Sequence, residues 1–186
     1  MRTTTLRPGL ALRARGYTLI EVLVVVTVLG IAAALLVPSM GQTGVLRVQA
    51  AVRTVVADIA YAQSDAVAYQ RRRGIVFEED ANKYTIYDVH GDAPFPDEDI
   101  LVDGTRESGR AEVSFNDPRF GGAMISAVSF DNTAILTFDE IGGPVQGPTS
   151  TAPSAGGYVE ITGSGSVFRV NVEAYTGRIS VQRVGG

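Results

Sequence analysis

The stretch that decides the fold is residues 16–40, GYTLIEVLVVVTVLGIAAALLVPSM, an apolar run with a single carboxylate, Glu21, near its start. An α-helix over residues 17–40 would be about 36 Å long, whereas the hydrocarbon core of a bilayer is about 30 Å thick. Large aliphatic side chains favour insertion by about 0.3 to 0.6 kcal/mol each, which together outweighs the cost of one acid, about 2.5 to 3.5 kcal/mol. We therefore expect residues 17–40 to form a tilted transmembrane helix.

Residues 1–16 form a basic leader ahead of this run. The leader has no acidic residue, and the positive-inside rule keeps such a segment in the cytoplasm, so the chain after the membrane helix is expected to face outward. A cleaved secretory signal peptide is the alternative, since small residues occur at 32–34; its apolar region is usually about 7 to 15 residues long, and the run here is longer. The basic residues of the leader are Arg2, Arg7, Arg13 and Arg15.

Glu21 lies one turn into the predicted helix and needs a partner, because an unpaired carboxylate in hydrocarbon is costly. The apolar run contains no basic side chain. A cut between Gly16 and Tyr17 would create a free α-amino group and would make Glu21 the fifth residue of the shortened chain. A processed N-terminus at Tyr17 is therefore the expected source of the missing positive charge.

The basic leader, Gly16, the residues YTLIE at 17–21 and the long apolar helix together resemble the class III signal of type IV pilins and type II secretion pseudopilins. The resemblance implies that a prepilin peptidase cuts after Gly16 on the cytoplasmic face and methylates the new N-terminus at Tyr17. It also implies that Glu21 pairs with the N-terminus of a neighbouring subunit during assembly.

Two further residues of the apolar run fit this resemblance. Gly30 and Pro38 fall where many pilins have a glycine and a proline that loosen the helix, so the resemblance implies flexibility there. Tyr17 departs from the commoner phenylalanine but keeps an aromatic ring. The alternative is an ordinary signal anchor in which Glu21 occurs by chance.

Length and composition bound the rest of the chain. Its 186 residues suit one domain and an anchor, and it has no cysteine, so an exported domain must be held together without disulfides. The net charge is −4, and removal of the leader leaves 12 basic against 20 acidic side chains, a net charge of −8. This balance disfavours a general nucleic-acid binder, because affinity for phosphates rests on positive charge.

Residues 41–73 have apolar side chains at steps of three or four, which predicts an amphipathic helix that continues the transmembrane segment. We expect it to end near Arg73, with Arg71, Arg72 and Arg73 in its last turn and Gly74 as its C-cap. A binding site for phosphate or for an acidic partner is the alternative role of the three arginines. The apolar positions are Val45, Val48, Val52, Val55, Ile59, Ala62 and Ala66, and the charges expected on the exposed side are Arg47, Arg53, Asp58 and Asp65.

Residues 74–186 are expected to form a β-rich globular domain, which makes the chain an α+β protein. Runs at 75–77 and 84–87 flank a polar turn and predict a hairpin. The Gly-rich link at 162–166 predicts a second hairpin turn; it lacks the third glycine and the following helix of a phosphate loop. Further strands are predicted at 111–115, 124–130, 134–138, 158–162, 167–173 and 178–184.

Two loops, residues 90–104 and 142–157, are expected on the surface. The second is expected to be a flexible connection, with a mobile contact segment as the alternative. The first offers oxygen ligands for calcium, but their spacing fits no EF-hand, so we predict no metal site. Its acidic residues are Asp92, Asp97, Glu98, Asp99 and Asp103.

The sequence contains no enzyme signature. His90 is the only histidine and cysteine is absent, which excludes thiol catalysis and a zinc site built from these two residue types. The adjacent Glu78 and Glu79 lie in a predicted turn, where we expect solvated charges. We predict no catalytic residue, no cofactor and no metal.

The segment ADIAYAQSDAVAYQRRR at 57–73 and the closing TGRISV at 176–181 resemble the GspH/FimT family, which contains the minor pseudopilin H of type II secretion and its pilus relatives. The resemblance implies a pilin-like fold in which a long helix, half transmembrane, packs on an antiparallel β-domain of two sheets. It implies a structural subunit of low abundance near the tip of a periplasmic pseudopilus, anchored in the bacterial inner membrane. The implied partners are prepilin peptidase, the major and other minor pseudopilins, and the inner-membrane assembly platform.

Two alternatives to a secretion pseudopilin remain open. A FimT-like minor type IV pilin would act in pilus assembly or DNA uptake, and the basic residues Arg169, Arg178 and Arg183, which face only Glu173, are its supporting feature. The net charge of −8 opposes it, so nucleic acid is not the expected partner. The other alternative is an anchored domain that never enters a filament, which an intact leader would reveal.

Overall fold

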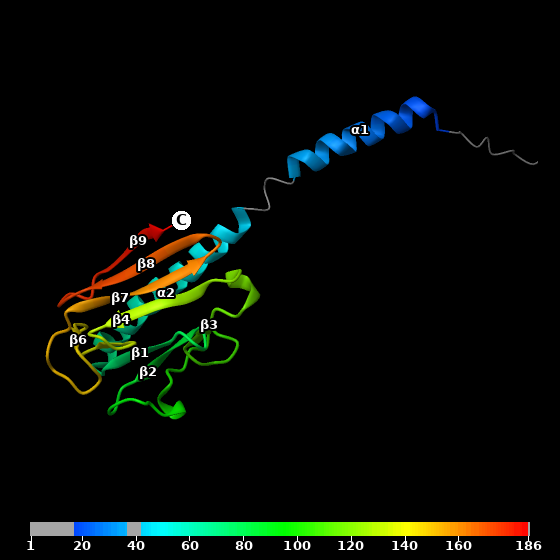
Figure 1. Cartoon of the computed structure of the whole chain (residues 1–186). Coiled ribbons are helices and arrows are strands. Elements are labelled where there is room, and N and C mark those ends of the chain that lie inside the picture. The colour runs from blue at the N-terminus through cyan, green and yellow to red at the C-terminus, as the bar shows by residue number, and fades with distance from the viewer. Residues whose placement is uncertain (1–16, 37–41, 186) are drawn as a thin grey trace, which may run out of the picture. The chain divides into compact units, whose positions relative to one another are not determined.

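The computed structural model describes residues 17–36 and 42–185 and divides the chain into two compact units, Met1–Met40 and Gly41–Gly186. Figure 1 shows helix α1 in the first unit, and helix α2 with the β-strands in the second. The predicted leader with Gly16, and also Pro38, lie outside the described residues. Whether the two helices join into one, as predicted, also falls outside them.

Helix α1 (Leu19–Leu36) begins directly after Thr18. The Thr18 hydroxyl accepts a hydrogen bond from the Glu21 N–H at 3.2 Å, and the Thr18 carbonyl accepts the first helical bond, from the Val22 N–H, at 3.2 Å. A threonine followed three residues later by glutamate is the spacing of a helix N-cap, which explains the starting point. The helix runs through Gly30 without interruption.

In the described part of the chain, no helix combines the length and the apolar character that crossing a membrane requires.

Helix α2 (Gln42–Tyr69) is amphipathic, as predicted. Its apolar stripe is buried in the core of the second unit: Val48, Val52, Val55, Ile59, Ala62 and Ala66 are at most 5% exposed. One prediction for this helix is wrong, because Asp58, expected on the exposed side, is only 8% exposed.

The C-terminal end of α2 also differs from the prediction. The helix stops at Tyr69 and not near Arg73, and Gln70 takes the left-handed conformation with φ 51°. The Arg71 N–H then bonds the Ala66 carbonyl at 3.1 Å, which closes the helix as a Schellman motif. The predicted C-cap, Gly74, lies instead within the first strand.

The first sheet has five antiparallel strands in the order β3-β2-β1-β5-β6. The predicted hairpin after the helix is confirmed as β1 and β2, which pair from Arg73↔Asp88 to Glu78↔Lys83. The short β6 was missed, because two residues give no alternating pattern. The strands are β1 (Arg73–Glu78), β2 (Lys83–Asp88), β3 (Glu112–Ser114), β5 (Ile135–Phe138) and β6 (Pro144–Val145).

The second sheet has four antiparallel strands in the order β4-β7-β8-β9. The predicted Gly-rich turn is confirmed between β7 and β8, where Ser164 and Gly165 have φ angles of 48° and 72°. Two consecutive positive φ angles are the requirement of a type I′ hairpin turn. The strands are β4 (Met124–Phe130), β7 (Gly156–Gly163), β8 (Ser166–Glu173) and β9 (Ile179–Gly185).

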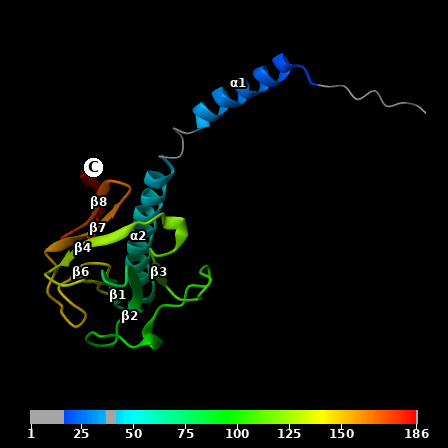
Figure 2. The same cartoon turned by 45° about the vertical axis from the view of Figure 1, so that its right-hand side comes forward.

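Helix α2 packs against both sheets, and the predicted α+β fold of one long helix on two antiparallel sheets is confirmed for the second unit (Figure 2). The core joins the helix stripe to the inner faces of both sheets. Aromatic rings link the two sheets, since Phe77 of β1 stacks on Phe130 of β4 with ring centroids 5.8 Å apart. Helix α2 and the two sheets therefore share one core.

Candidate functional site

The N-terminal motif is described from Tyr17 onward. Tyr17 and Thr18 precede the helix, and the Tyr17 side chain is 82% exposed. Thr18 caps α1, because its hydroxyl accepts a hydrogen bond from the Glu21 N–H. Glu21 stands in the first turn of the helix.

The surface of α1 is apolar all round. From Leu19 to Ile31 its large aliphatic side chains are 52 to 84% exposed within this chain. The Thr27 hydroxyl donates to the Leu23 carbonyl at 2.7 Å and so needs no outside partner. Among the described residues, no salt bridge or side-chain hydrogen bond satisfies the Glu21 carboxylate. A helix that is apolar on every side is normally covered on every side, and Glu21 is the polar group that this covering must accommodate.

The three arginines after α2 are structural and do not form an open phosphate site. Arg73 is 4% exposed, and its Nε and Nη1 atoms each lie 2.5 Å from a carboxylate, that of Asp65 on α2 and that of Asp88 on β2 respectively. Arg71 bonds the second oxygen of Asp88 at 2.8 Å. The predicted place of Arg73 in the last helical turn is wrong, because α2 ends at Tyr69 and Arg73 begins the first strand. The alternative of an anion site is also wrong for Arg73, because two carboxylates already neutralise its charge.

Arg72 ties the loop at residues 142–157 to the end of the helix. Its Nη1 atom donates to the carbonyls of Pro148 and Ser150 at 2.9 and 2.8 Å, and its Nε atom lies 3.2 Å from Glu140. A hydrogen bond from its own backbone N–H, with help from Arg72, lowers the pKa of Glu140. The segment predicted as a flexible connection, residues 142–157, is thus fastened at its centre.

Acidic side chains of the loop at residues 90–104 pair separately with different cationic or hydroxyl groups. Asp97 meets Arg110 at 3.3 Å, Asp99 meets the His90 Nδ1 atom at 3.2 Å, and Asp92 accepts from Thr149 at 2.7 Å. Within the described residues, no three acidic or histidine side chains converge as metal ligands would. The alternative of a calcium site in this loop therefore has no support in the geometry.

A buried polar network joins α2, β2 and the loop before β3. Asp58 accepts from the Tyr84 hydroxyl at 2.5 Å and from the Arg106 Nη2 atom at 2.7 Å. Arg106 also donates through Nε to Asp103 at 2.6 Å. Burial, followed by the charge and the hydrogen bond of Asp58, raises the pKa of Tyr84 well above its ordinary value.

The electrostatics of this network favour the charged form of Arg106 and the ionised form of Asp103. Burial disfavours the charged form of Arg106, but its hydrogen bonds to Asp58 and Asp103 outweigh burial, and its pKa is raised. Hydrogen bonds from Thr105 and then from Arg106 lower the pKa of Asp103. The network was missed in the sequence because its members are far apart, with 48 positions between Asp58 and Arg106.

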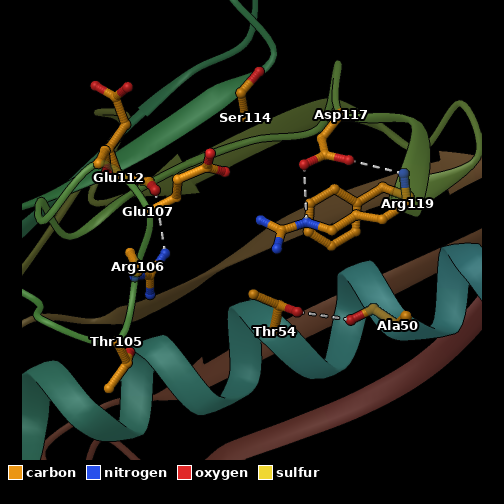
Figure 3. Close-up of a pocket in the computed structure, with 11 residues that line it drawn as sticks. Ala50, Thr54, Thr105, Arg106, Glu107, Glu112, Ser114, Asp117 and Arg119 are labelled. Atoms are coloured by element: carbon orange, nitrogen blue, oxygen red, sulfur yellow. Dashed lines mark hydrogen bonds and ion pairs between the residues drawn. The ribbon is translucent and has the colours of Figure 1, made fainter.

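A groove of about 950 Å³ lies beside this network, between α2 and the segments that flank β3 (Figure 3). Figure 3 shows Thr54 and Ala50 on the helix below, and Arg106, Glu112, Asp117 and Arg119 on β3 and its flanking segments above. The polar groups are engaged locally: Thr54 donates to the Ala50 carbonyl at 3.0 Å, and Arg119 pairs with Asp117 at 3.2 Å. The groove contains no histidine or cysteine and no converging acid–base pair.

The three arginines considered for DNA contact do not form one surface. Arg169 bonds Glu160 at 2.6 Å and lies over the Tyr158 ring, so its charge is neutralised. Arg183 pairs in register with Phe168, the neighbour of Arg169 on β8. Adjacent residues of a strand point to opposite faces, so Arg183 and Arg169 lie on opposite faces of the sheet. Arg178 is 3.8 Å from Glu173 and is largely exposed.

The closing TGRISV segment is fastened to α2. The Gln63 amide donates to the carbonyls of Gly142 and Thr176 at 2.8 and 3.0 Å, so that one side chain holds two turns. Gly177 has φ 64°, and an added Cβ would lie 2.6 Å from the Gln63 Nε2 atom. This position therefore requires glycine on two grounds, which gives the threonine-glycine-arginine pattern a structural reason.

Two parts of the chain resemble known proteins, the N-terminal segment in its sequence and the α+β domain in its fold. Residues 12–37 match the family model described as "Prokaryotic N-terminal methylation motif". This match includes Gly16, Tyr17 and Glu21.

A particular solved structure has the same fold. The chain is similar to the minor pseudopilin EpsH from the Type 2 Secretion System of Vibrio cholerae, with a TM-score of 0.50 and 10% identity, over 75% of this chain and 99% of that chain. At this identity the likeness establishes the fold. No protein of curated function matches the sequence.

Proposed function

We propose that this chain is a minor pseudopilin, a structural subunit of a type II secretion pseudopilus. In this proposal a prepilin peptidase cuts after Gly16 and methylates the amine of Tyr17. The methylation motif over residues 12–37 and the EpsH-like fold support the proposal from two different parts of the chain.

The observation that carries the proposal is the isolated carboxylate of Glu21 in α1. Every other polar side chain of that helix is satisfied internally, since Thr27 bonds its own backbone. An unpaired carboxylate among apolar side chains is retained only when a partner compensates it. The free amine created at Tyr17 of a neighbouring subunit supplies that partner, and the bare apolar surface of α1 supplies the packing between subunits.

The location and the partners follow from this role. The leader arginines place the N-terminus in the cytoplasm, and the second unit then faces the periplasm. The chain resides in the inner membrane before it enters the pseudopilus. Its partners are prepilin peptidase, the other pseudopilins and the inner-membrane assembly platform.

The second unit acts as a structural and not a catalytic domain in this proposal. Its buried charges fasten loops to α2, as Arg73 does with Asp65 and Asp88. The FimT-like alternative would need a basic surface, which the opposed Arg169 and Arg183 do not provide.

The proposal is tested by the mass of the native N-terminus. We expect the chain to begin at a methylated Tyr17, and we expect Gly16→Ala to retain the leader. Gly30→Ala is the matched control, because an added Cβ there meets no atom within 4 Å and processing should stay normal. A native chain that begins at Met1, or normal processing of Gly16→Ala, would exclude the proposed role.

Assembly is tested separately from processing. Glu21→Ala should be cut and methylated normally but should be lost from the filament fraction, because the neighbour's amine then has no carboxylate. Thr27→Ala is its control, since it removes a polar group that already has an internal partner. Equal incorporation of the two variants would remove the argument from Glu21.

A further inference from the structure

An apolar groove of about 540 Å³ lies on the second unit, between α2 and the face of β8 and β9. Its floor is formed by Phe168 and by Val181, which is 45% exposed. Its wall is a ridge of α2 that runs from Gln49 to Ala60. The groove is separate from the polar groove of Figure 3 and from the Asp58 network.

The groove is the part of the sheet that α2 leaves uncovered. Four strands spaced about 4.8 Å apart make a face about 19 Å wide, whereas a helix with its side chains is about 10 Å across. Helix α2 packs on the two central strands, β7 and β8, so the face of the edge strand β9 extends beyond it, and a second helix resting there would also project past the sheet edge. A strand added to the outer edge of β9 would not reach the α2 ridge.

The size of the groove agrees with a helix. A cylinder about 10 Å across has a volume of about 420 Å³ per helical turn. A helix that rests on a surface is about half embedded, so the groove accommodates two to three turns. The ridge from Gln49 to Ala60 is about 16 Å long, which is also three turns. Ala57 and Ala60 are exposed alanines on this ridge, so a second helix axis can approach closely.

The positive charge of the groove determines which kind of helix can bind in it. Arg53 lines the groove, and within the described residues no carboxylate pairs with it. The carboxylates of α2 itself are engaged, Asp58 with Arg106 and Asp65 with Arg73. The α2 helix of a second copy would therefore bring no free acid to Arg53, but would add two more unpaired arginines.

We propose that this groove binds an amphipathic helix of a different pilin-like subunit, one that presents an apolar stripe and a carboxylate to Arg53. The inference rests on the proposed function, because a filament supplies such a neighbour at high local concentration. Subunits would then contact one another through this groove of the second unit as well as through α1. The charge of Arg53 would decide which subunit can be the neighbour.

Photo-crosslinking of the full chain in its native cells tests the inference. A benzoylphenylalanine probe replaces Ala57 in the groove, and the same probe replaces Ala68 as the control, because Ala68 is an exposed alanine of α2 outside the groove. We expect the probe at 57 to give an adduct about tenfold more abundant than the probe at 68. Mass spectrometry should place the adduct in a helix of another protein with an N-terminal methylation motif.

The charge requirement is tested in the same experiment. Arg53→Glu in the Ala57 probe chain should lower the adduct about tenfold, and Arg53→Lys should keep it. Arg47→Glu is the matched control, because in the described part of the chain no carboxylate pairs with Arg47 either, and Arg47 lies against Gly121, outside the groove. Equal losses from the two glutamate variants would overturn the charge argument.

The outcomes distinguish this inference from the proposed function. The docking inference alone is overturned if the chain is processed and reaches the filament but the probe at 57 does not label a helix of another subunit. Labelling of only a second copy, lipid or a non-helical segment, or no labelling, would be such a result. A chain that keeps its leader overturns the proposed function, and the docking inference falls with it. Adducts of equal abundance at 57 and 68 also overturn the docking site.

Discussion

Removal of the Asp58 carboxylate is the perturbation whose cost can be worked out most directly. In Asp58→Ala the Tyr84 hydroxyl, on a side chain only 1% exposed, loses its acceptor. A hydrogen bond to a charged group contributes about 1.5 to 3 kcal/mol when its loss leaves a buried donor unsatisfied. Arg106 loses one of its two carboxylate partners but keeps Asp103, so the lost ion pair lowers the free energy of unfolding by a smaller amount, about 1 kcal/mol. We expect a total loss of about 3 kcal/mol in the free energy of unfolding.

Urea denaturation of the full chain, at constant detergent, measures this loss. With a denaturant slope of about 2 kcal/mol per molar, the midpoint should fall by about 1.5 M. Glu79→Ala is the control, because it also removes one negative charge, from an exposed turn. Tyr84→Phe alone should cost about 1.5 kcal/mol, and the double variant should cost less than the sum, because the two groups share one bond. An Asp58→Ala midpoint within about 0.3 M of the Glu79→Ala midpoint would refute the reasoning.

Three further predictions concern single positions. Gly177→Ala should destabilise the second unit by about 3 kcal/mol in thermal unfolding, against about 1 kcal/mol for Gly165→Ala, since both have positive φ but only Gly177 lacks space for a Cβ. Asp103 should stabilise the folded chain fully at pH values above its ordinary pKa of 3.8, and this contribution should be lost as the pH falls through the lowered pKa that Asp103 has in the folded state. The urea midpoints of the wild type and of Asp103→Asn should therefore converge at low pH. Thr18→Val should abolish hydrogen-exchange protection of the Glu21 amide, whereas Thr18→Ser should keep it; protection that survives in the valine variant would show that the cap is not needed.

Periodicity was sufficient to predict most of the second unit. The apolar steps of α2 placed Val48, Val55 and Ile59 in the core, where the structure has them. The β-strand patterns located the hairpin of β1 and β2 and the long strands of the second sheet. These predictions succeed because each of these elements has one face in the core and repeats that face several times.

The helix end could not be predicted in the same way. Arg71 to Arg73 followed by Gly74 has the composition of a helix terminus, but Gln70 adopts the left-handed conformation first. The reason lies outside the local sequence. Arg73 begins β1 and pairs in register with Asp88 of β2, so the contacts of the sheet outweigh the local preference of Arg73 for a helix end.

Charges buried by distant partners are the features that a sequence pattern cannot show. Asp58 lies beside the apolar stripe of α2, and it is buried between the Tyr84 hydroxyl of β2 and Arg106, which arrives from a loop 48 positions away. A chain without cysteine has no disulfide to hold such a loop, and a buried ion pair with a tyrosine donor fastens it instead. Such a pair specifies position more than it adds stability, since each charge must first be removed from water. It follows that replacing Asp58 and Arg106 by apolar residues together with Tyr84→Phe, which removes the hydroxyl that would otherwise be left unsatisfied, should cost less in urea denaturation than Asp58→Ala alone while leaving the loop before β3 less firmly fixed to α2.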